Sequence, residues 1–286
     1  MININIQKAL LGSQGEMQLT VKLNIKEHDF VAISGKSGSG KTTLLRILAG
    51  LETAHGEISV EEESWLNNSK SLAVQDRKIG FVFQDYALFE NMSVEKNLLF
   101  VNNDKKLAKH LLELTELSAF SSRLPRTLSG GQKQRVSLCR AFMNKPKLLL
   151  MDEPLSALDS QMRLKLQQDI LKLHKEFRTT TIMVSHDPSE IYKLSNRVLV
   201  LENGQIIQDG EAKDILLQTQ GSQKFSLNGE LIDIIKADVI FVAVVAIGQQ
   251  IVEVVLDKSE VEVFKIGDKV QVSTKAFAPT LNLTQS

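Results

Sequence analysis

One glycine-rich segment constrains this chain more than any other. Residues 35–42 read Gly-Lys-Ser-Gly-Ser-Gly-Lys-Thr, and apolar runs at 30–33 and 44–48 flank them. This spacing predicts a buried strand, a glycine-rich turn and then a helix. Glycine tolerates positive φ, so the turn can wrap around an anion, which the N–H groups and the dipole of the helix also attract. The sequence therefore predicts a polyphosphate site, in which Lys41 reaches the β- and γ-phosphates and Thr42 binds Mg²⁺.

The composition limits what kind of protein this is. A length of 286 residues suits one large domain followed by a small one. Lys and Arg number 34, as do Asp and Glu, and this balance argues against a general nucleic-acid binder. The one cysteine, Cys139, allows no intrachain disulfide and no thiolate metal cluster, which fits a reducing compartment.

Neither the N-terminal segment nor the apolar stretches of the sequence predict a segment inserted in a membrane. The N-terminus alternates like a strand and has no basic segment before an apolar block, so we expect no signal peptide. The longest apolar stretch, Val239 to Ile247, is too short to span a bilayer. We expect a soluble chain whose membrane role, if it has one, comes through a partner.

Hydrophobic patterning predicts an α/β fold with a parallel sheet covered on both faces. Strands are predicted over 17–25, 30–33, 56–60, 79–83, 148–151 and 180–184, and helical segments over 93–120, 131–143 and 161–177. The polar stretch 64–77 is predicted to be a loop. Asn203-Gly204 lies between two apolar runs and predicts a hairpin. After about residue 219 only short β-type runs remain, so we place a domain boundary near Gly221-Ser222.

An acidic pair follows the apolar run 148–151. Asp152 and Glu153 are expected at the end of a buried strand beside the glycine-rich loop, where Mg²⁺ has to be held. We expect Asp152 to contact the metal through water and Glu153 to polarise an attacking water. Taken alone, acidic residues after a strand could equally cap a helix.

A third motif decides the family resemblance. Leu128-Ser129-Gly130-Gly131-Gln132, together with the loop 35–42 and the acidic pair, resembles the signature of ATP-binding-cassette ATPases. The resemblance covers the chain to about residue 215. In it, Gln84 resembles the Q-loop residue, Ser156-Ala157-Leu158-Asp159 the D-loop, and His186 the switch histidine.

The resemblance implies a fold, a site and cofactors. The fold is a P-loop NTPase cassette over 1–220, with a parallel-sheet core, an antiparallel β subdomain and a helical subdomain at about 85–145; a small all-β, barrel-like domain over 221–286 follows. The cofactors are ATP and Mg²⁺. The implied catalytic residues are Glu153, His186 and Lys41, and the implied metal-site residues are Thr42, Gln84 and Asp152. The implied nucleotide-binding residues are Gly35, Lys36, Ser37, Gly38, Ser39, Gly40, Lys41, Thr42, Thr43, Gln84, Ser129, Gly130, Gly131, Gln132 and Asp159.

The signature also implies an assembly. Ser129, Gly130 and Gly131 precede a helix and make a second anion site, which one chain cannot fold onto its own first site. The family arrangement is a head-to-tail homodimer or pair of cassettes, with each ATP between one chain's loop and the other's signature. Cassettes usually stack an aromatic residue near the N-terminus on adenine, but residues 1–29 contain none, and Met17 takes that place by position.

Three kinds of cassette protein compete. A soluble ATPase acting on DNA or ribosomes usually has two cassettes, a long insertion or a basic face, which this chain lacks. A regulatory ATP-binding module is the second alternative. The segment 85–94 resembles the stretch of importer ATPases on which a permease helix docks, so the favoured interpretation is an importer ATPase. That implies a peripheral place on the cytoplasmic face of the inner membrane, with permease subunits as partners, an external substrate-binding protein acting indirectly, and no nucleic acid.

The tail bears on the cargo. Residues 222–231 and 270–277 resemble the opening and closing segments of a molybdate-binding, Mop-type domain, related to TOBE domains, although Lys224 and Phe225 depart from the usual Arg-Asn. Molybdate is therefore the favoured cargo, with sulfate, ferric iron, polyamine and sugar as alternatives. The donors available for an oxyanion are Ser222, Lys224, Ser273, Thr274 and Lys275. Phe225 adds no donor, so we favour a structural contact between two tails over oxyanion binding.

Overall fold

The computed structural model describes residues 1–12, 15–68, 70–156, 158–217, 224–237, 240–248, 250–256, 261 and 264–275. The chain divides into two compact units, Met1–Leu217 and Gln218–Ser286. The predicted boundary at 221–222 lies outside the described residues. Among the helices of the described segments, none is both long enough and apolar enough to cross a bilayer.

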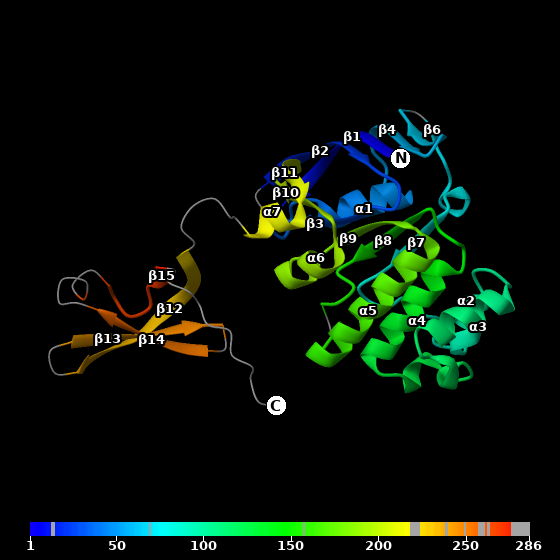
Figure 1. The fold of residues 1–286 in the computed structure, drawn as a ribbon. Coiled ribbons are helices and arrows are strands. Elements are labelled where there is room, and N and C mark those ends of the chain that lie inside the picture. The colour runs from blue at the N-terminus through cyan, green and yellow to red at the C-terminus, as the bar shows by residue number, and fades with distance from the viewer. Residues whose placement is uncertain are drawn as a thin grey trace. The chain divides into compact units, whose positions relative to one another are not determined.

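A mixed sheet forms the centre of the first unit (Figure 1). Its described strands run in the order β6-β5-β4-β1-β2-β11-β10-β3-β9-β8-β7. Their bounds are β1 Ile2–Gly12, β2 Gly15–Ile25, β3 Phe30–Ser34, β4 His55–Val60, β5 Glu63–Asn67, β6 Lys70–Ser71, β7 Ile79–Val82, β8 Leu148–Asp152, β9 Thr180–Val184, β10 Arg197–Glu202 and β11 Gln205–Glu211. The strands β10, β3, β9, β8 and β7 pair in parallel, whereas β1 pairs antiparallel with β2 and β4. The predicted strands and the hairpin at Asn203-Gly204 are confirmed.

The prediction of a loop over 64–77 is wrong. This stretch forms β5, β6 and a 3₁₀ turn at Val74–Asp76, and Trp65 in β5 is fully buried. The pairing of β5 with β4 shifts register at Ile58/Ser59, which leaves Trp65 and Leu66 both buried in succession. The shift removes the alternation by which a half-buried strand is recognised in a sequence.

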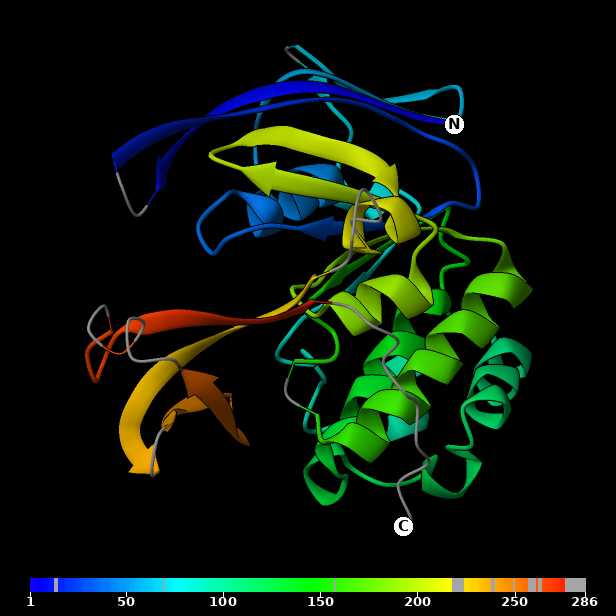
Figure 2. The same cartoon turned by 60° about the vertical axis from the view of Figure 1, so that its left-hand side comes forward.

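Helices cover both faces of the parallel strands (Figures 1 and 2). Their bounds are α1 Lys41–Ala49, α2 Val94–Leu99, α3 Lys105–Leu114, α4 Gly130–Phe142, α5 Ser160–Phe177, α6 Pro188–Leu194 and α7 Ala212–Leu217. Residues of α1 share one apolar core with β1, β2 and β4, and residues of α4 and α5 share another with β7 and β8. The strand β3, which leads into the glycine-rich segment 35–42, contributes residues to both cores and is therefore packed on both sides.

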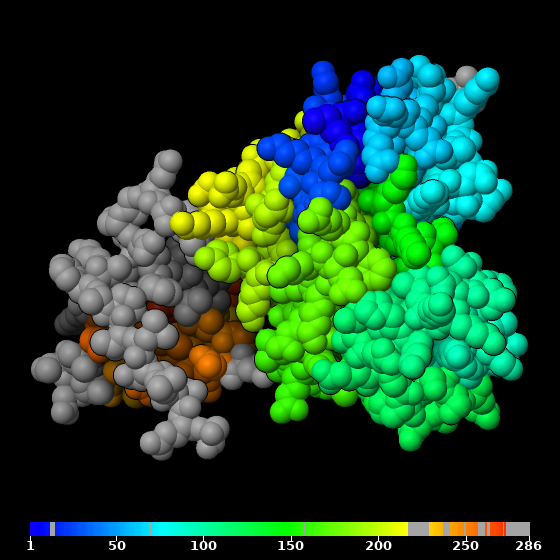
Figure 3. Space-filling model, turned by 45° about the vertical axis from the view of Figure 1, so that its right-hand side comes forward, coloured from blue at the N-terminus to red at the C-terminus, as the bar shows by residue number. Residues whose placement is uncertain are grey.

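The helical segment predicted over 93–120 is interrupted. Ser93 caps α2 as expected, since its Oγ accepts a hydrogen bond from the Lys96 N–H at 3.3 Å. The chain then leaves the helix, and Asp104 caps a new one, α3, by accepting from the Leu107 N–H at 3.0 Å. The residues of α2 and α3 belong to the green lobe of Figure 3.

The described part of the second unit is a four-stranded antiparallel sheet. Its strands are β12 Lys224–Ala237, β13 Ile240–Ile247, β14 Gln250–Leu256 and β15 Lys269–Lys275, in the order β14-β13-β12-β15. The register pairs Lys224 with Lys275 and Phe225 with Thr274. Ser222 and the side chains of Lys224, Phe225, Ser273, Thr274 and Lys275 lie outside the described part, so both predictions for the tail remain predictions.

Candidate nucleotide-binding site

The glycine-rich segment connects the end of β3 to the start of α1. Gly35, Gly38 and Gly40 have φ values of 142°, 80° and 99°, which side chains rarely tolerate. A Cβ on Gly35 would lie 2.0 Å from the backbone oxygen of Leu201 in β10. Gly40 is the N-cap of α1 and supplies no side-chain oxygen to the first N–H groups of that helix. Those groups are therefore free to bind an anion held by the loop.

Lys41 lies folded into this loop. Its Nζ donates to the carbonyl oxygens of Gly35 and Lys36, both at 2.8 Å. Burial lowers the pKa of Lys41, while the carboxylates of Glu153 and Asp152 act in the opposite direction. A buried ammonium between carbonyl groups has much to gain from a phosphate, since charge-assisted bonds to anions are stronger than neutral ones.

The start of α1 and the end of β8 together offer oxygen ligands. Thr42 Oγ1 donates to Asp152 Oδ1 at 3.2 Å. Burial raises the pKa of Asp152, so a cation beside this carboxylate would relieve the cost of its charge. Hydroxyl and carboxylate oxygens are the ligands that Mg²⁺ prefers, so these two residues fit the metal. Gln84, the third residue assigned to the metal, donates through Nε2 to Ser156 Oγ at 3.5 Å.

Glu153 and His186 face each other from the ends of two neighbouring parallel strands. Glu153 follows β8, and His186 comes two residues after β9. Glu153 has a left-handed backbone, with φ at 44°, and its N–H donates to Val184 O at 3.1 Å. The Nδ1 of His186 lies 3.5 Å from Glu153 Oε1. Strained backbone of this kind persists where the surroundings hold it, and here it positions a carboxylate beside an imidazole.

One hollow of about 440 Å³ brings most of these groups together. It is lined by Leu10, Leu11, Met17, Gly35, Ser37, Gly38, Gly40, Lys41, Thr42, Thr43, Glu153 and His186. Met17 is among these residues, and its contact with the base stays a prediction. Leu10 and Leu11 were not anticipated; Leu10 pairs with Met17 across the β1–β2 ladder, and Leu11 is 89% exposed. Two adjacent leucines at the end of a strand, one of which must face solvent, were the signal available in the sequence.

Ser129–Gln132 are not among the described residues that line this hollow. Ser129 caps α4, because its Oγ accepts from the Gln132 N–H at 3.3 Å while Gln132 Oε1 accepts from the Ser129 N–H at 2.9 Å. Asp159 caps α5 by accepting from the Met162 N–H at 2.9 Å. Their roles toward a nucleotide stay predictions, and within one chain these residues stabilise helix starts.

The fold and this hollow define a nucleotide-binding protein of the P-loop class. The family model described as ABC transporter matches residues 19–156. A probable sulfate/thiosulfate import ATP-binding protein CysA of Chlorella vulgaris is 44% identical over 204 residues, which is 68% of this chain and 85% of the relative. The chain belongs to the ABC transporter family of ATP-binding proteins.

Two other relatives extend well beyond the region that this chain matches. The sulfate/thiosulfate import ATP-binding protein CysA of Mesostigma viride is 42% identical over 219 residues, covering 73% of this chain and 62% of the relative. The spermidine/putrescine import ATP-binding protein PotA of Bacillus anthracis is 43% identical over 204 residues, covering 68% of this chain and 61% of the relative. The chain thus spans about three fifths of the length of these two relatives.

Solved structures agree with the fold. An ATP-binding cassette solved as a dimer in a post-hydrolysis state, bound to ADP and Pi, is 31% identical with a TM-score of 0.63, covering 74% of this chain and 99% of that one. The cbiO1 protein of Clostridium perfringens, part of the ABC transporter complex cbiONQ, is 25% identical with a TM-score of 0.67, covering 77% and 91%.

Proposed function

We propose that this chain is the ATP-hydrolysing subunit of an ABC importer. The observation that carries the proposal is the convergence of Lys41, Thr42, Glu153 and His186 on one hollow. Lys41 and the loop N–H groups bind the phosphates. Mg²⁺, held by Thr42 and Asp152, supplies charge neutralisation when bound. Glu153 accepts a proton from the attacking water, and His186 orients Glu153 and the γ-phosphate.

The base of the nucleotide has a place in the same hollow. Leu10, Leu11 and Met17 line this hollow from the two paired strands β1 and β2. These side chains offer apolar area but no aromatic face. The base is therefore held by dispersion against aliphatic groups rather than by ring stacking.

The active form is a head-to-tail dimer. Most residues of the segment 35–43 line the hollow together with Glu153, whereas Ser129–Gln132 do not. The signature of one chain therefore reaches the nucleotide of a second chain in this proposal. Two copies then enclose two ATP molecules, and loss of the γ-phosphate removes the charge that bridges them. ATP binding and hydrolysis shift the population between closed and open dimers.

A mixed dimer tests this arrangement. Lys41→Ala and Ser129→Arg each inactivate both sites of a homodimer. A heterodimer of the two variants has one site with both defects and one site with neither. Because a two-fold dimer pairs chains at random, mixing equal amounts should restore about a quarter of wild-type ATP hydrolysis, measured as phosphate release.

The control mixes two variants that share a defect. Lys41→Ala combined with Lys41→Met leaves no intact site and should stay inactive. If Lys41→Ala and Ser129→Arg exchange subunits, as shown by differently tagged chains, and no activity returns, the shared-site arrangement is wrong.

The permease partner has a surface to dock on in the segment 85–94. Phe89 and Phe100 are 37% and 62% exposed, and their ring centroids lie 4.6 Å apart. The backbone behind them is held firmly: buried Asn97 bonds both the N–H and the carbonyl of Phe89, and Arg140 Nη1 donates to Ala87 O at 2.6 Å. We assign this surface to a permease helix, which places the chain peripherally on the cytoplasmic face of the membrane, with an external binding protein as indirect partner.

For the cargo we propose a tetrahedral oxyanion. Relatives carry the names of sulfate/thiosulfate importers, and one is named for spermidine and putrescine. The likeness of the tail to Mop-type and TOBE domains favours molybdate, a dianion of the same shape as sulfate. Polyamine is the alternative that a relative's name supports.

The tail is proposed to be a structural contact between copies rather than a cargo sensor. Calorimetric titration of the full chain with molybdate, tungstate and sulfate should therefore be silent. The titration uses the Lys41→Ala background, because the phosphate loop itself attracts such dianions. Micromolar binding that disappears when Lys275→Ala is added would assign an oxyanion site to the tail instead.

A further inference from the structure

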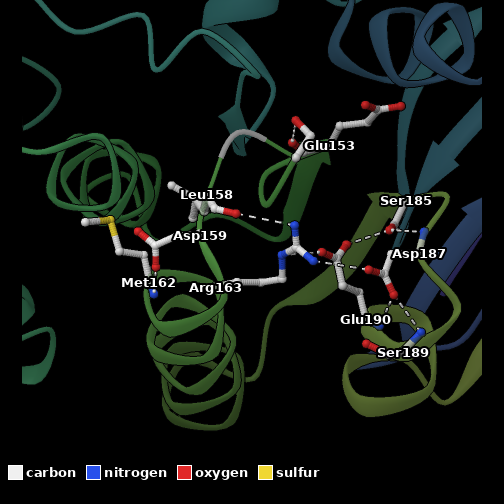
Figure 4. A network of polar contacts seen from close by, with 10 residues as sticks. Glu153, Leu158, Asp159, Met162, Arg163, Ser185, Asp187, Ser189 and Glu190 are labelled. Atoms are coloured by element: carbon white, nitrogen blue, oxygen red, sulfur yellow. Dashed lines mark hydrogen bonds and ion pairs between the residues drawn. The ribbon is translucent and has the colours of Figure 1, made fainter. Parts of the chain in front are cut away.

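A guanidinium joins two segments that leave neighbouring strands of the sheet. Arg163 lies in the first turn of α5, where its N–H donates to Asp159 O at 2.9 Å. Its side chain points away from the helix toward the start of α6, as Figure 4 shows. The Nη2 donates to Leu158 O at 3.3 Å, the Nη1 lies 3.4 Å from Asp187 Oδ2, and the Nε lies 3.5 Å from Glu190 Oε1.

The acidic partners of Arg163 are themselves fixed. Glu190 is buried, and its Oε2 accepts from Ser185 Oγ at 2.7 Å. Ser185 Oγ in turn accepts from the Asp187 N–H at 3.1 Å. Asp187 caps α6, since its Oδ1 accepts from the N–H groups of Ser189 and Glu190 at 2.8 and 3.3 Å. Each bond limits where the next group can lie.

His186 stands between two members of this network. Ser185 and Asp187 hold the backbone on either side of it, while its own side chain is 68% exposed and lies over Glu153. Among the described residues, the His186 ring forms no hydrogen bond, and its Nδ1 only approaches Glu153. The position of the imidazole therefore depends on its backbone, and that backbone depends on Arg163 through Asp187 and Glu190.

We infer that Arg163 is a positioning residue, which locks the segment carrying His186 to the segment carrying Leu158 and Asp159. The inference rests on the proposed ATP hydrolysis. Within the described part of the chain, the polar contacts of the Arg163 side chain reach none of the residues that line the hollow. Arg163 acts through His186 on one side and through Leu158 on the other. The planar guanidinium presents its donors in a fixed fork that spans Leu158 O and Asp187 Oδ2 while Nε lies beside Glu190, whereas an ammonium is a compact point charge.

The same contact couples two segments of the proposed site. Asp159, which is predicted to bind nucleotide, directly follows Leu158. By holding Leu158 O and the loop of His186 together, Arg163 makes a displacement of either segment move the other. The predicted contacts of His186 and Asp159 with the nucleotide then change together, since packed elements switch between discrete arrangements.

The test is a double-mutant cycle in the full chain. Arg163→Met should lower kcat for ATP hydrolysis by about 10- to 100-fold, since a displaced catalytic group costs this much, while KM changes little. In the His186→Ala background the same substitution should add little further loss. Arg163→Lys, which keeps the positive charge but not the planar fork, should fall between wild type and Arg163→Met.

A matched control separates positioning from general damage. Lys165→Met on the same helix removes an exposed ion pair with Glu116 and should leave kcat unchanged. Equal thermal midpoints for Arg163→Met and wild type, with kcat lowered, support positioning. Losses of Arg163→Met and His186→Ala that simply multiply would overturn the inference, because independent sites are additive in free energy.

Amide hydrogen exchange supplies a readout that needs no catalysis. Arg163→Met should speed exchange at Asp187 and Glu190 at least tenfold while leaving β8 and β9 protected. Unchanged exchange at these two amides would refute the positioning role of Arg163, whatever the kinetic results. A wild-type chain that hydrolyses no ATP would refute the proposed function, and the exchange result would still decide on Arg163.

Discussion

Replacing Glu153 with Gln is expected to slow ATP hydrolysis by about 10²- to 10⁴-fold, the range by which a general base accelerates a reaction. The amide keeps the size of the side chain and its place beside His186, but it cannot take a proton from water. ATP binding should persist, because Lys41 and the loop that hold the phosphates are unchanged. Single-turnover phosphate release measures the loss, and nucleotide titration measures the binding.

The same variant should accumulate a closed dimer. If hydrolysis opens the dimer, blocking it leaves ATP between the two chains, and size-exclusion chromatography with ATP and Mg²⁺ should show a species twice the monomer mass. Glu113→Gln, which alters an exposed acid of α3, is the control and should hydrolyse ATP at the wild-type rate and accumulate no more of this species than the wild type does. Turnover near the wild-type rate in Glu153→Gln would remove Glu153 from the chemistry.

Replacing Arg77 with Leu is expected to give the largest loss of stability. Arg77 is 2% exposed, and no carboxylate contacts it among the described residues. Its guanidinium donates to the backbone oxygens of Ile47, Leu48, Trp65 and Leu72 and to Ser71 Oγ. The oxygens of Ile47 and Trp65 keep the backbone N–H groups of Gly50 and Leu72 as donors, whereas those of Leu48 and Leu72 lose theirs. Each carbonyl left buried without a donor costs about 1–3 kcal/mol, so the free energy of unfolding should fall by roughly 2–6 kcal/mol.

The loss of stability in Arg77→Leu should also affect the glycine-rich loop 35–42. Ile47 and Leu48 end the helix α1 that begins at Lys41, and a cation at a helix C-terminus stabilises the helix. Trp65, the one tryptophan of the chain, lies with its ring centroid 5.5 Å from the Arg77 guanidinium, so its fluorescence reports unfolding of this region in urea. Arg126→Leu, which replaces an exposed arginine, is the control and should leave the unfolding midpoint unchanged. An unchanged midpoint in Arg77→Leu would contradict the prediction and would mean that water replaces the guanidinium at Leu48 O and Leu72 O.

Local patterns in the sequence determined the loop 35–42, the acidic pair after β8, Ser93 as a cap and the hairpin at Asn203-Gly204. Each of these features is built from residues close together in the chain, so composition and spacing carry the whole signal. The family resemblance follows from the order of such motifs. Most residues of the glycine-rich segment that line the hollow were thus predictable, because the backbone geometry of such a turn demands particular residue types.

The tertiary structure decided what depends on pairing between distant segments. The strand over 63–67 was missed because a register shift against β4 breaks its alternation, and only the paired strand shows that Trp65 is buried. Leu10 and Leu11 reach the hollow because the β1–β2 ladder sets Leu10 opposite Met17. Arg163 meets Asp187 and Glu190 across 24 and 27 positions of sequence, by the packing of α5 beside α6. Side-chain networks of this kind are invisible in a sequence, since nothing in the spacing of their members says which ends of which elements meet.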